Sequence, residues 1–414
     1  MKAFHCLLAT LLAASLGRLA AQTPAYPSCN GLVMAGYQGW FSTPGDGLGR
    51  GWHHYQKKGK FEPGYASVDF WPDVSDYDKT YETAFFRPDG SKAKVYSPAD
   101  PSTADLHFRW MKEYGIDGVY LQRFVSEIRH EKGKRHFDTV LANALSAGRR
   151  YGRAVSIMYD LSGCSSADMD VVMNDWTDIR RRFALDDPDR NPTYLRHRNR
   201  PLLAVWGVGF NDNRMYTTGD VQGLMRRLKE SGLSLLIGVP YYWRTLDKDT
   251  LPDSSLHEVI ADCDVVMPWA VGRYNGESYT RIAATVLEGD LHWCRDKGVD
   301  YMPLAFPGFS WGNLKESPSV YNQIPREKGA FFWKQVAGAR TVGAGSLYVA
   351  MFDEIDEGTA IFKTLREEEV PGNASGRFVG IETGLPSDYY LWLTGQAGNW
   401  FHGKPGYGAV LPRR

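Results

Sequence analysis

Apolar runs and amphipathic segments alternate along nearly the whole chain. The apolar runs show little alternation with polar residues, which is typical of strands buried on both faces of a parallel sheet. The segments between them repeat apolar positions at a helical period; in residues 103–115, Leu106, Trp110 and Met111 share one face. The expected strands cover residues 31–41, 117–124, 154–163, 200–210, 234–243, 264–272, 300–311 and 346–354.

Eight alternating units predict a (β/α)8 TIM barrel, a single domain with long loops at the C-terminal face. The alternative is an open, doubly wound sheet, which would carry a glycine-rich phosphate loop after an early strand. The sequence contains no GxGxxG or P-loop motif, so the barrel is favoured. We expect the barrel to span residues 22–370, followed by a C-terminal extension, 371–414, in which the segment SDYYLWL packs on the barrel as a short helix.

The N-terminus has the pattern of a secretory signal peptide, residues 1–21. A lysine precedes an apolar stretch from Ala3 to Leu16, and small residues follow at Ala20 and Ala21. The apolar stretch is too short to span a bilayer comfortably. The sequence therefore predicts an exported protein, secreted or periplasmic, without membrane insertion.

Composition narrows the function classes further. The 48 basic residues balance the 48 acidic residues, so no nucleic-acid partner is expected. Aromatic residues make up 13% of the chain, and Trp and Tyr can stack on sugar rings as well as fill a core. No zinc-binding or redox cysteine motif occurs, so neither a metal nor another cofactor is expected. The spacing leaves a Cys263–Cys294 disulfide open, and it leaves His53 and His54 either as sugar contacts or as residues of a surface loop.

The candidate chemistry lies at the C-terminal ends of the strands, where barrel enzymes place their active sites. The densest group is acidic and follows the last strand, in FDEIDEG at 352–358. Like charges at this density cost stability unless something uses them. The residues expected to bind substrate are Tyr37, Gln38, Trp40, Gln122, Arg123, Tyr159, Asp160, Trp206, Tyr241, Trp243, Trp269, Trp311 and Asp353.

Aromatic side chains around a carboxylate pair suit the hydrolysis of a glycosidic bond. That reaction needs one carboxylic acid for the leaving oxygen and a second carboxylate as nucleophile or base. Crowding separates the two pKa values, and Glu354 and Glu357 are the expected catalytic pair. Two other interpretations of the acidic segment stay open: acids that favour the N-terminus of a following helix, and oxygen ligands for calcium.

The segment FDEIDEGTAIF resembles the eighth-strand motif NEWHEGT of glycoside hydrolase family 99, which contains endo-acting α-mannosidases and mannanases. The matching residues are Glu354, Glu357, Gly358 and Thr359. GYQGWF at 36–41 is similar to the aromatic first strand of that clan, and the chain is identified as a family 71/99-like protein, a group often labelled xylosidase or arabinosidase. The resemblance implies a cofactor-free, retaining glycosidase that acts on a glycan. Glu354 would act as a base on the 2-hydroxyl of the substrate, and Glu357 would protonate the leaving group.

Three positions depart from that motif. Asp353, Ile355 and Asp356 stand where the family has Asn, Trp and His. Because these positions shape the pocket, the replacements support a second interpretation, a non-catalytic glycan-binding protein on the same barrel. The primary prediction is a secreted glycoside hydrolase that cleaves a polysaccharide or an oligosaccharide.

Overall fold

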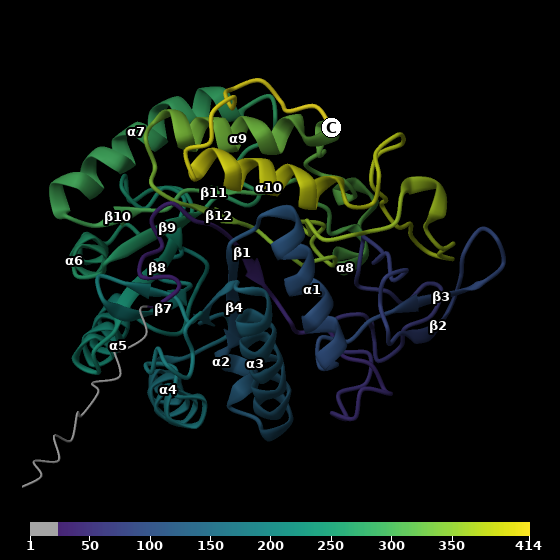
Figure 1. Cartoon of the computed structure of the whole chain (residues 1–414), viewed down its shortest axis with the longest axis horizontal. Helices are drawn as coiled ribbons and strands as arrows, with labels where there is room; N and C mark the ends of the chain where they lie inside the picture. Colours follow the sequence, from purple (N-terminus) through teal and green to yellow (C-terminus); the bar gives the residue numbers. More distant parts are fainter. Residues whose placement is uncertain (1–23) are drawn as a thin grey trace, which may run out of the picture.

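Residues 24–414, the part of the chain that the computed structural model describes, form a (β/α)8 barrel (Figure 1). The predicted signal peptide, residues 1–21, lies outside the described residues. Within residues 24–414, no helix combines the length and apolar character that crossing a membrane requires.

The first six barrel strands pair in parallel, each with the next: β1 (Val33–Tyr37), β4 (Gly118–Phe124), β5 (Ala154–Asp160), β7 (Arg200–Trp206), β8 (Ser234–Pro240) and β9 (Val265–Trp269).

The barrel closes through a seventh strand that is broken in two. β10 (Asp300–Tyr301) pairs with β9, whereas β11 (Leu304–Ala305) pairs with β12 (Leu347–Val349). β12 in turn pairs with β1, so the sheet returns to its first strand. The break coincides with Pro303, which has no N–H for a ladder. The predicted barrel is confirmed, although strands seven and eight are shorter than the apolar runs 300–311 and 346–354 suggested.

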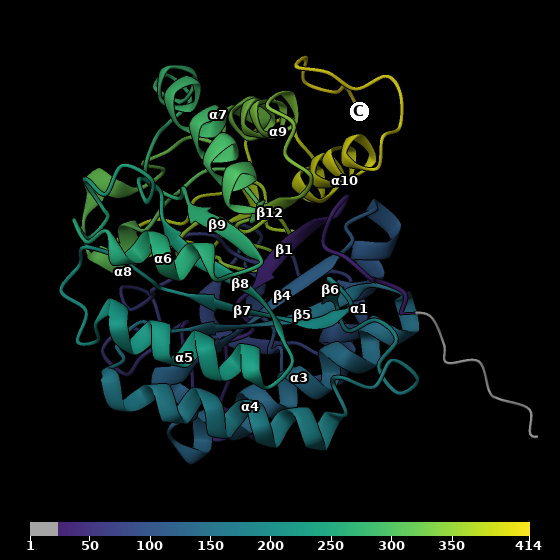
Figure 2. The ribbon, with the colours of Figure 1, turned by 90° about the vertical axis from the view of Figure 1, so that its left-hand side faces the viewer.

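A layer of helices surrounds the strands (Figure 2). Strands β4, β5 and β8 are buried at every position, as expected where the barrel interior covers one face and helices cover the other. The helices of this layer are α1 (Pro101–Tyr114), α3 (Glu131–Tyr151), α4 (Met169–Phe183), α5 (Thr218–Glu230), α6 (Ser255–Ala261), α7 (Tyr279–Lys297) and α9 (Ala330–Thr341).

Shorter elements lie in the loops. The helices α2 (Val125–Ile128) and α8 (Gly312–Lys315) follow β4 and the seventh strand, respectively. An antiparallel hairpin, β2 (Tyr81–Phe86) and β3 (Lys92–Val95), lies in the long connection after β1, and β6 (Arg196–His197) pairs with β7. The single 3-10 turns are Ser166–Asp168, Pro318–Val320, Glu327–Gly329 and Glu367–Glu369.

The cysteines of the described residues are not paired. Cys29, Cys164, Cys263 and Cys294 are buried free thiols, so the disulfide between Cys263 and Cys294 is not formed.

The C-terminal extension ends in α10 (Tyr389–Phe401), which packs against α1 and α9. Trp400 of α10 stacks on Trp333 of α9, with ring centroids 5.6 Å apart. At Gly395, a Cβ atom would collide with the backbone carbonyl of Tyr114 at the end of α1. Glycine therefore allows the two helices to approach closely enough to pack.

Replacing this glycine tests the docking of α10. Gly395→Ala should lower the free energy of unfolding by about 1–3 kcal/mol because the added methyl group must displace backbone. Gly223→Ala is the matched control, since Gly223 lies in α5 with no atom within 4 Å of the added Cβ. It should raise stability by up to about 1 kcal/mol through helix propensity. Urea unfolding measures both, and equal stabilisation by the two variants would contradict the packing of α10 on α1.

Candidate active site

The acidic segment after β12 lies at the C-terminal mouth of the barrel. Its position is fixed by the end of β1: the N–H of Phe352 donates to the carbonyl of Gly36 (2.7 Å). The Asp353 carboxylate accepts the backbone N–H groups of Gln38 (2.7 Å) and Gly39 (3.0 Å). No helix begins within residues 353–366, so the interpretation of these acids as a helix N-terminus was wrong.

Glu354 is buried, 3% exposed, and both of its carboxylate oxygens have a partner. The side-chain amide of Gln38 donates to one oxygen, and the hydroxyl of Thr359 donates to the other (2.5 Å). Glu357 is only half-buried, and its carboxyl group accepts no hydrogen bond from residues 24–414. One glutamate is thus locked in place, and the other is open to an incoming ligand.

Both glutamates have raised pKa values. Burial, followed by the charges of Glu357 and Asp356, raises the pKa of Glu354 well above its ordinary value. Burial, followed by the charge of Asp356, raises the pKa of Glu357 to about 7, although Lys315 and His54 oppose the shift. A pair of this kind holds a proton close to neutral pH, as a general acid requires.

Two further aspartates face the same space. Asp160, at the end of β5, is 9% exposed, and burial raises the pKa of its carboxyl group. Asp356 is 2% exposed; its Oδ2 lies 3.2 Å from Nδ1 of His54, and its Oδ1 has no partner among the described residues. Within residues 24–414, the acids that follow β12 do not converge closely enough to share one metal ion, which argues against the calcium interpretation.

Aromatic rings form the walls of the mouth. Trp206 and Trp269 are half-buried and lie edge to face, with centroids 5.3 Å apart. Trp269 also approaches Tyr348 of β12 at 6.3 Å. A Cβ at Gly238 would collide with the indole of Trp206, so glycine in β8 makes room for this wall. Half-buried indole rings beside carboxylates are typical of sugar sites.

Several buried polar atoms of the mouth have no hydrogen-bond partner in the described part of the chain. Such atoms usually find a partner, because leaving one unpaired costs roughly 1–3 kcal/mol. Hydroxyl groups, which can both donate and accept, match unpaired atoms of both kinds. They are Gln38 Oε1, Trp40 Nε1, Gln122 Oε1, Trp206 Nε1 and Asp356 Oδ1.

The predicted roles of Arg123 and Tyr159 in substrate binding were wrong. Arg123 is 2% exposed and pairs with Asp175 of α4 (2.5 Å) and Asp138 of α3 (2.6 Å). The hydroxyl of Tyr159 donates to the same Asp175 (2.7 Å). Both side chains point into the helix layer because successive strand residues face opposite sides of a sheet. Their neighbours Gln122 and Asp160 are the ones that face the barrel interior.

Four other predicted contacts also lie elsewhere. The Tyr37 hydroxyl bonds to His107 of α1 (2.9 Å), and the Trp243 indole donates to Asp290 of α7 (3.1 Å). Tyr241 is buried next to Tyr274, with ring centroids 5.5 Å apart. Asp353 is fully buried, and its carboxylate accepts hydrogen bonds from the backbone of the loop after β1. The structure thus brings together Gln38, Trp40, Gln122, Asp160, Trp206, Trp269, Glu354 and Glu357, with Trp311 on the rim.

Tyr348 and Thr359 are the residues of the site that the sequence analysis did not select. The amide of Gln122 donates to the Tyr348 hydroxyl (3.1 Å), and a Cβ at Gly36 would overlap that hydroxyl. Tyr348 lies inside the apolar run of β12, where no polar alternation indicates which side chains face the barrel interior. Thr359 appeared only as part of the motif, and its hydroxyl proves to hold Glu354.

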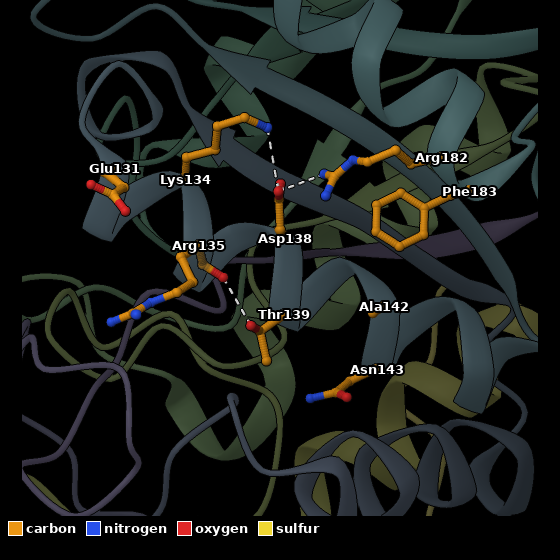
Figure 3. Close-up of a pocket in the computed structure, with 9 residues that line it drawn as sticks. All are labelled: Glu131, Lys134, Arg135, Asp138, Thr139, Ala142, Asn143, Arg182 and Phe183. Atoms are coloured by element: carbon orange, nitrogen blue, oxygen red, sulfur yellow. Dashed lines mark hydrogen bonds and ion pairs between the residues drawn. The ribbon is translucent and has the colours of Figure 1, made fainter.

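A separate groove of about 480 Å³ lies on the outside of the barrel, between α3 and α4 (Figure 3). The charges at its centre are paired: Asp138 lies 3.3 Å from Lys134 and 2.5 Å from Arg182. Asp138 is also the residue that pairs with the buried Arg123. The groove is therefore the outer side of an ion-pair network in the helix layer.

The fold is similar to solved glycoside hydrolase structures. The GH99 endo-α-mannosidase from Bacteroides thetaiotaomicron matches with a TM-score of 0.65 at 15% identity, over 92% of this chain and 100% of that chain. Its complex with bis-tris-propane gives 0.63 at 15% identity, over 91% and 98%. A glycoside hydrolase-like protein gives 0.53 at 13% identity, over 80% and 94%. The chain has a GH99-like barrel fold. The sequence itself matches no family model and no curated protein.

The GH99-like barrel confirms the fold that the FDEIDEG motif implied. The three residues that differ from the family motif lie in different environments. The Asp353 carboxylate accepts hydrogen bonds from backbone N–H groups, and Ile355 is fully buried. Of the three, only Asp356 keeps a free polar atom in the mouth.

The assignment of Arg123 to the helix layer can be tested through its partner. Asp175→Asn leaves a buried guanidinium with one carboxylate fewer, which should lower the free energy of unfolding by about 2–4 kcal/mol. Asp178→Asn is the control, because Asp178 lies one turn away on α4 and pairs with Lys134 at 31% exposure. It should cost less than about 1 kcal/mol. Equal effects in urea unfolding would contradict a structural role for Arg123.

Proposed function

We propose that the protein is a glycoside hydrolase that cleaves a glycosidic bond with Glu354 and Glu357. The observation that carries the proposal is the unequal environment of these two carboxyl groups. Glu354 is held by two donors inside the mouth, whereas Glu357 is unpaired and open, with its pKa raised to about 7. Glycoside hydrolysis needs this division between a fixed carboxylate and a protonated acid.

Glu357 acts first as the general acid. Its carboxyl proton passes to the glycosidic oxygen as the bond from that oxygen to the anomeric carbon breaks, which makes the leaving group an alcohol. The position of Glu357 at the open side of the mouth supports this role, because the leaving sugar must depart past it. The indole rings of Trp206 and Trp269 would stack on the sugar faces and hold the bond in place.

Glu354 acts on the substrate's own 2-hydroxyl, as the resemblance to the family 99 motif implies. It accepts the hydroxyl proton while the oxygen attacks the anomeric carbon, which gives an epoxide-like sugar. Water then opens this ring at the anomeric carbon and gives its proton to Glu357, and Glu354 returns its proton to the 2-oxygen. Two inversions at one carbon give net retention. The donors Gln38 and Thr359 support the anionic form that the first step needs.

The substrate class we propose is a neutral glycan. The orphan donors and acceptors around the mouth suit hydroxyl groups, and the fold neighbour from Bacteroides thetaiotaomicron is described as an endo-α-mannosidase. α-Mannans are therefore the first substrates in a panel of polysaccharides in which newly released reducing ends are measured.

The proposal that the protein is exported rests on the pattern of residues 1–21.

The alternative of a non-catalytic glycan-binding protein is the weaker one. It drew its support from the three departures from the motif, and two of them lie in packing or backbone roles. Binding to glycans without release of reducing ends, across the whole panel, would favour the alternative over the enzyme.

Removing the acid should abolish most of the turnover. Glu357→Gln should lower kcat about 10²- to 10⁴-fold on a substrate with a poor leaving group, because the variant lacks the acid that protonates the departing oxygen. Glu316→Gln is the control, since Glu316 lies on the rim, 52% exposed, and pairs with Lys58. It should leave kcat unchanged. An unaltered rate in Glu357→Gln would remove this residue from the mechanism.

The pH dependence follows from the raised pKa of the acid. A general acid works when protonated, so kcat/KM should fall as the pH rises through about 7. Asp356→Asn removes a negative charge that raises the Glu357 pKa, so the fall in kcat/KM should shift to lower pH by about half a unit. Lys315→Met removes a positive charge that lowers the same pKa, so the fall in kcat/KM should shift to higher pH. Shifts of the same sign in the two variants would contradict the assignment.

A further inference from the structure

Two histidines and a glutamate converge beside the acidic mouth. His53 and His54 lie in the loop after β1, and Glu127 lies in α2 after β4. All three side chains are half-buried, and one ligand atom of each lies within 4.8 Å of the other two. From this geometry we propose a binding site for one divalent transition-metal ion of the zinc type, with these three residues as ligands.

Two of the three spacings between the ligand atoms are close to those of a tetrahedral site. Nε2 of His53 lies 3.3 Å from Oε1 of Glu127, and Nε2 of His54 lies 3.7 Å from the same oxygen. In a tetrahedral zinc site with bonds of about 2.0–2.1 Å, neighbouring ligand atoms are about 3.3–3.4 Å apart. Small side-chain rotations would therefore complete the geometry, and a water molecule would fill the fourth position.

The groups around the ligands suit a metal site. His54 presents Nε2 to the site while its Nδ1 bonds to Asp356 (3.2 Å), an arrangement that fixes the ring of a metal-binding histidine. The ring is also stacked on the indole of Trp40, at 3.8 Å between centroids and 6° between planes. Glu127 is held through its other oxygen by Arg50. The ligands are thus fixed from outside and need little reorganisation.

The local charge favours a cation as well. Glu127 pairs with the guanidinium of Arg50, and Asp356 pairs with His54, so two carboxylates and one guanidinium leave one net negative charge when the imidazoles are neutral. A dication would offset this charge and make full use of the imidazole lone pairs. The ion would also tie the loop after β1 to the loop after β4 across one side of the mouth.

The competing explanation is an ion-pair network in which Glu127 is the shared acceptor of Arg50, His53 and His54. It requires no metal, and it predicts no selective retention of zinc. The two explanations differ in what the full-length protein binds, whether or not the protein is a glycosidase.

Metal content measures the difference directly. Chelator-treated protein is dialysed against 10 µM ZnCl₂ at about pH 7.5 and then against metal-free buffer, and zinc is quantified by mass spectrometry. We expect about one zinc per chain in the wild type and at least tenfold less in His53→Gln and in Glu127→Gln. His292→Gln is the matched control, because His292 is an exposed histidine on α7, and it should retain the full equivalent.

Cobalt gives a second readout. The Co²⁺-loaded wild type should show the intense visible absorption of a four-coordinate ion, and both ligand variants should lose it. Wild-type protein that retains less than a tenth of an equivalent would overturn the site. Equal retention by the wild type and by a ligand variant that circular dichroism shows to be folded would overturn it too. If Glu127→Gln does not fold, the wild type and His53→Gln decide the outcome.

Discussion

Carboxylates confined in a poorly solvated mouth, with few cations to neutralise them, are the constraint on which the site depends. Desolvation disfavours the charged form of each acid, and neighbouring negative charges add to the effect. The pair formed by Glu354 and Glu357 therefore retains one proton at a pH where a surface glutamate has lost its own, which leaves one carboxylate of the pair to act as a base. The closed barrel supplies the burial, and the backbone N–H groups that hold Asp353 fix the segment that carries both glutamates.

The architecture was largely predictable because its signal is local. Apolar runs without polar alternation gave the strands, and their number gave the barrel. At the ends of β4 and β5, only one of the two neighbouring residues predicted to bind substrate faces the interior. Gln122 and Asp160 face the interior, whereas Arg123 and Tyr159 pair with Asp175 in the helix layer. Successive side chains of a strand point to opposite faces, and a strand end alone does not indicate which of two neighbours points inward.

The remaining features depend on contacts between distant parts of the chain. The His53 and Glu127 side chains meet across 74 positions, so no spacing motif could reveal them. Likewise, Gly238 allows the Trp206 wall, and Gly395 allows the docking of α10, through close approaches that only the folded barrel defines. Of the motif departures, Asp356 alone lies beside a histidine of the first loop, His54.

A pH titration of the Glu357 carboxyl group tests most directly whether the mouth holds its acid protonated. Carbon-13 NMR of protein labelled at the glutamate side-chain carboxyl groups follows every glutamate through a pH titration, and loss of one resonance in Glu357→Gln assigns it. We expect this carboxyl group to titrate with a midpoint near 7. A midpoint between about 4 and 5, as for an exposed glutamate, would show that the mouth does not hold its acid protonated, and the central claim would fail.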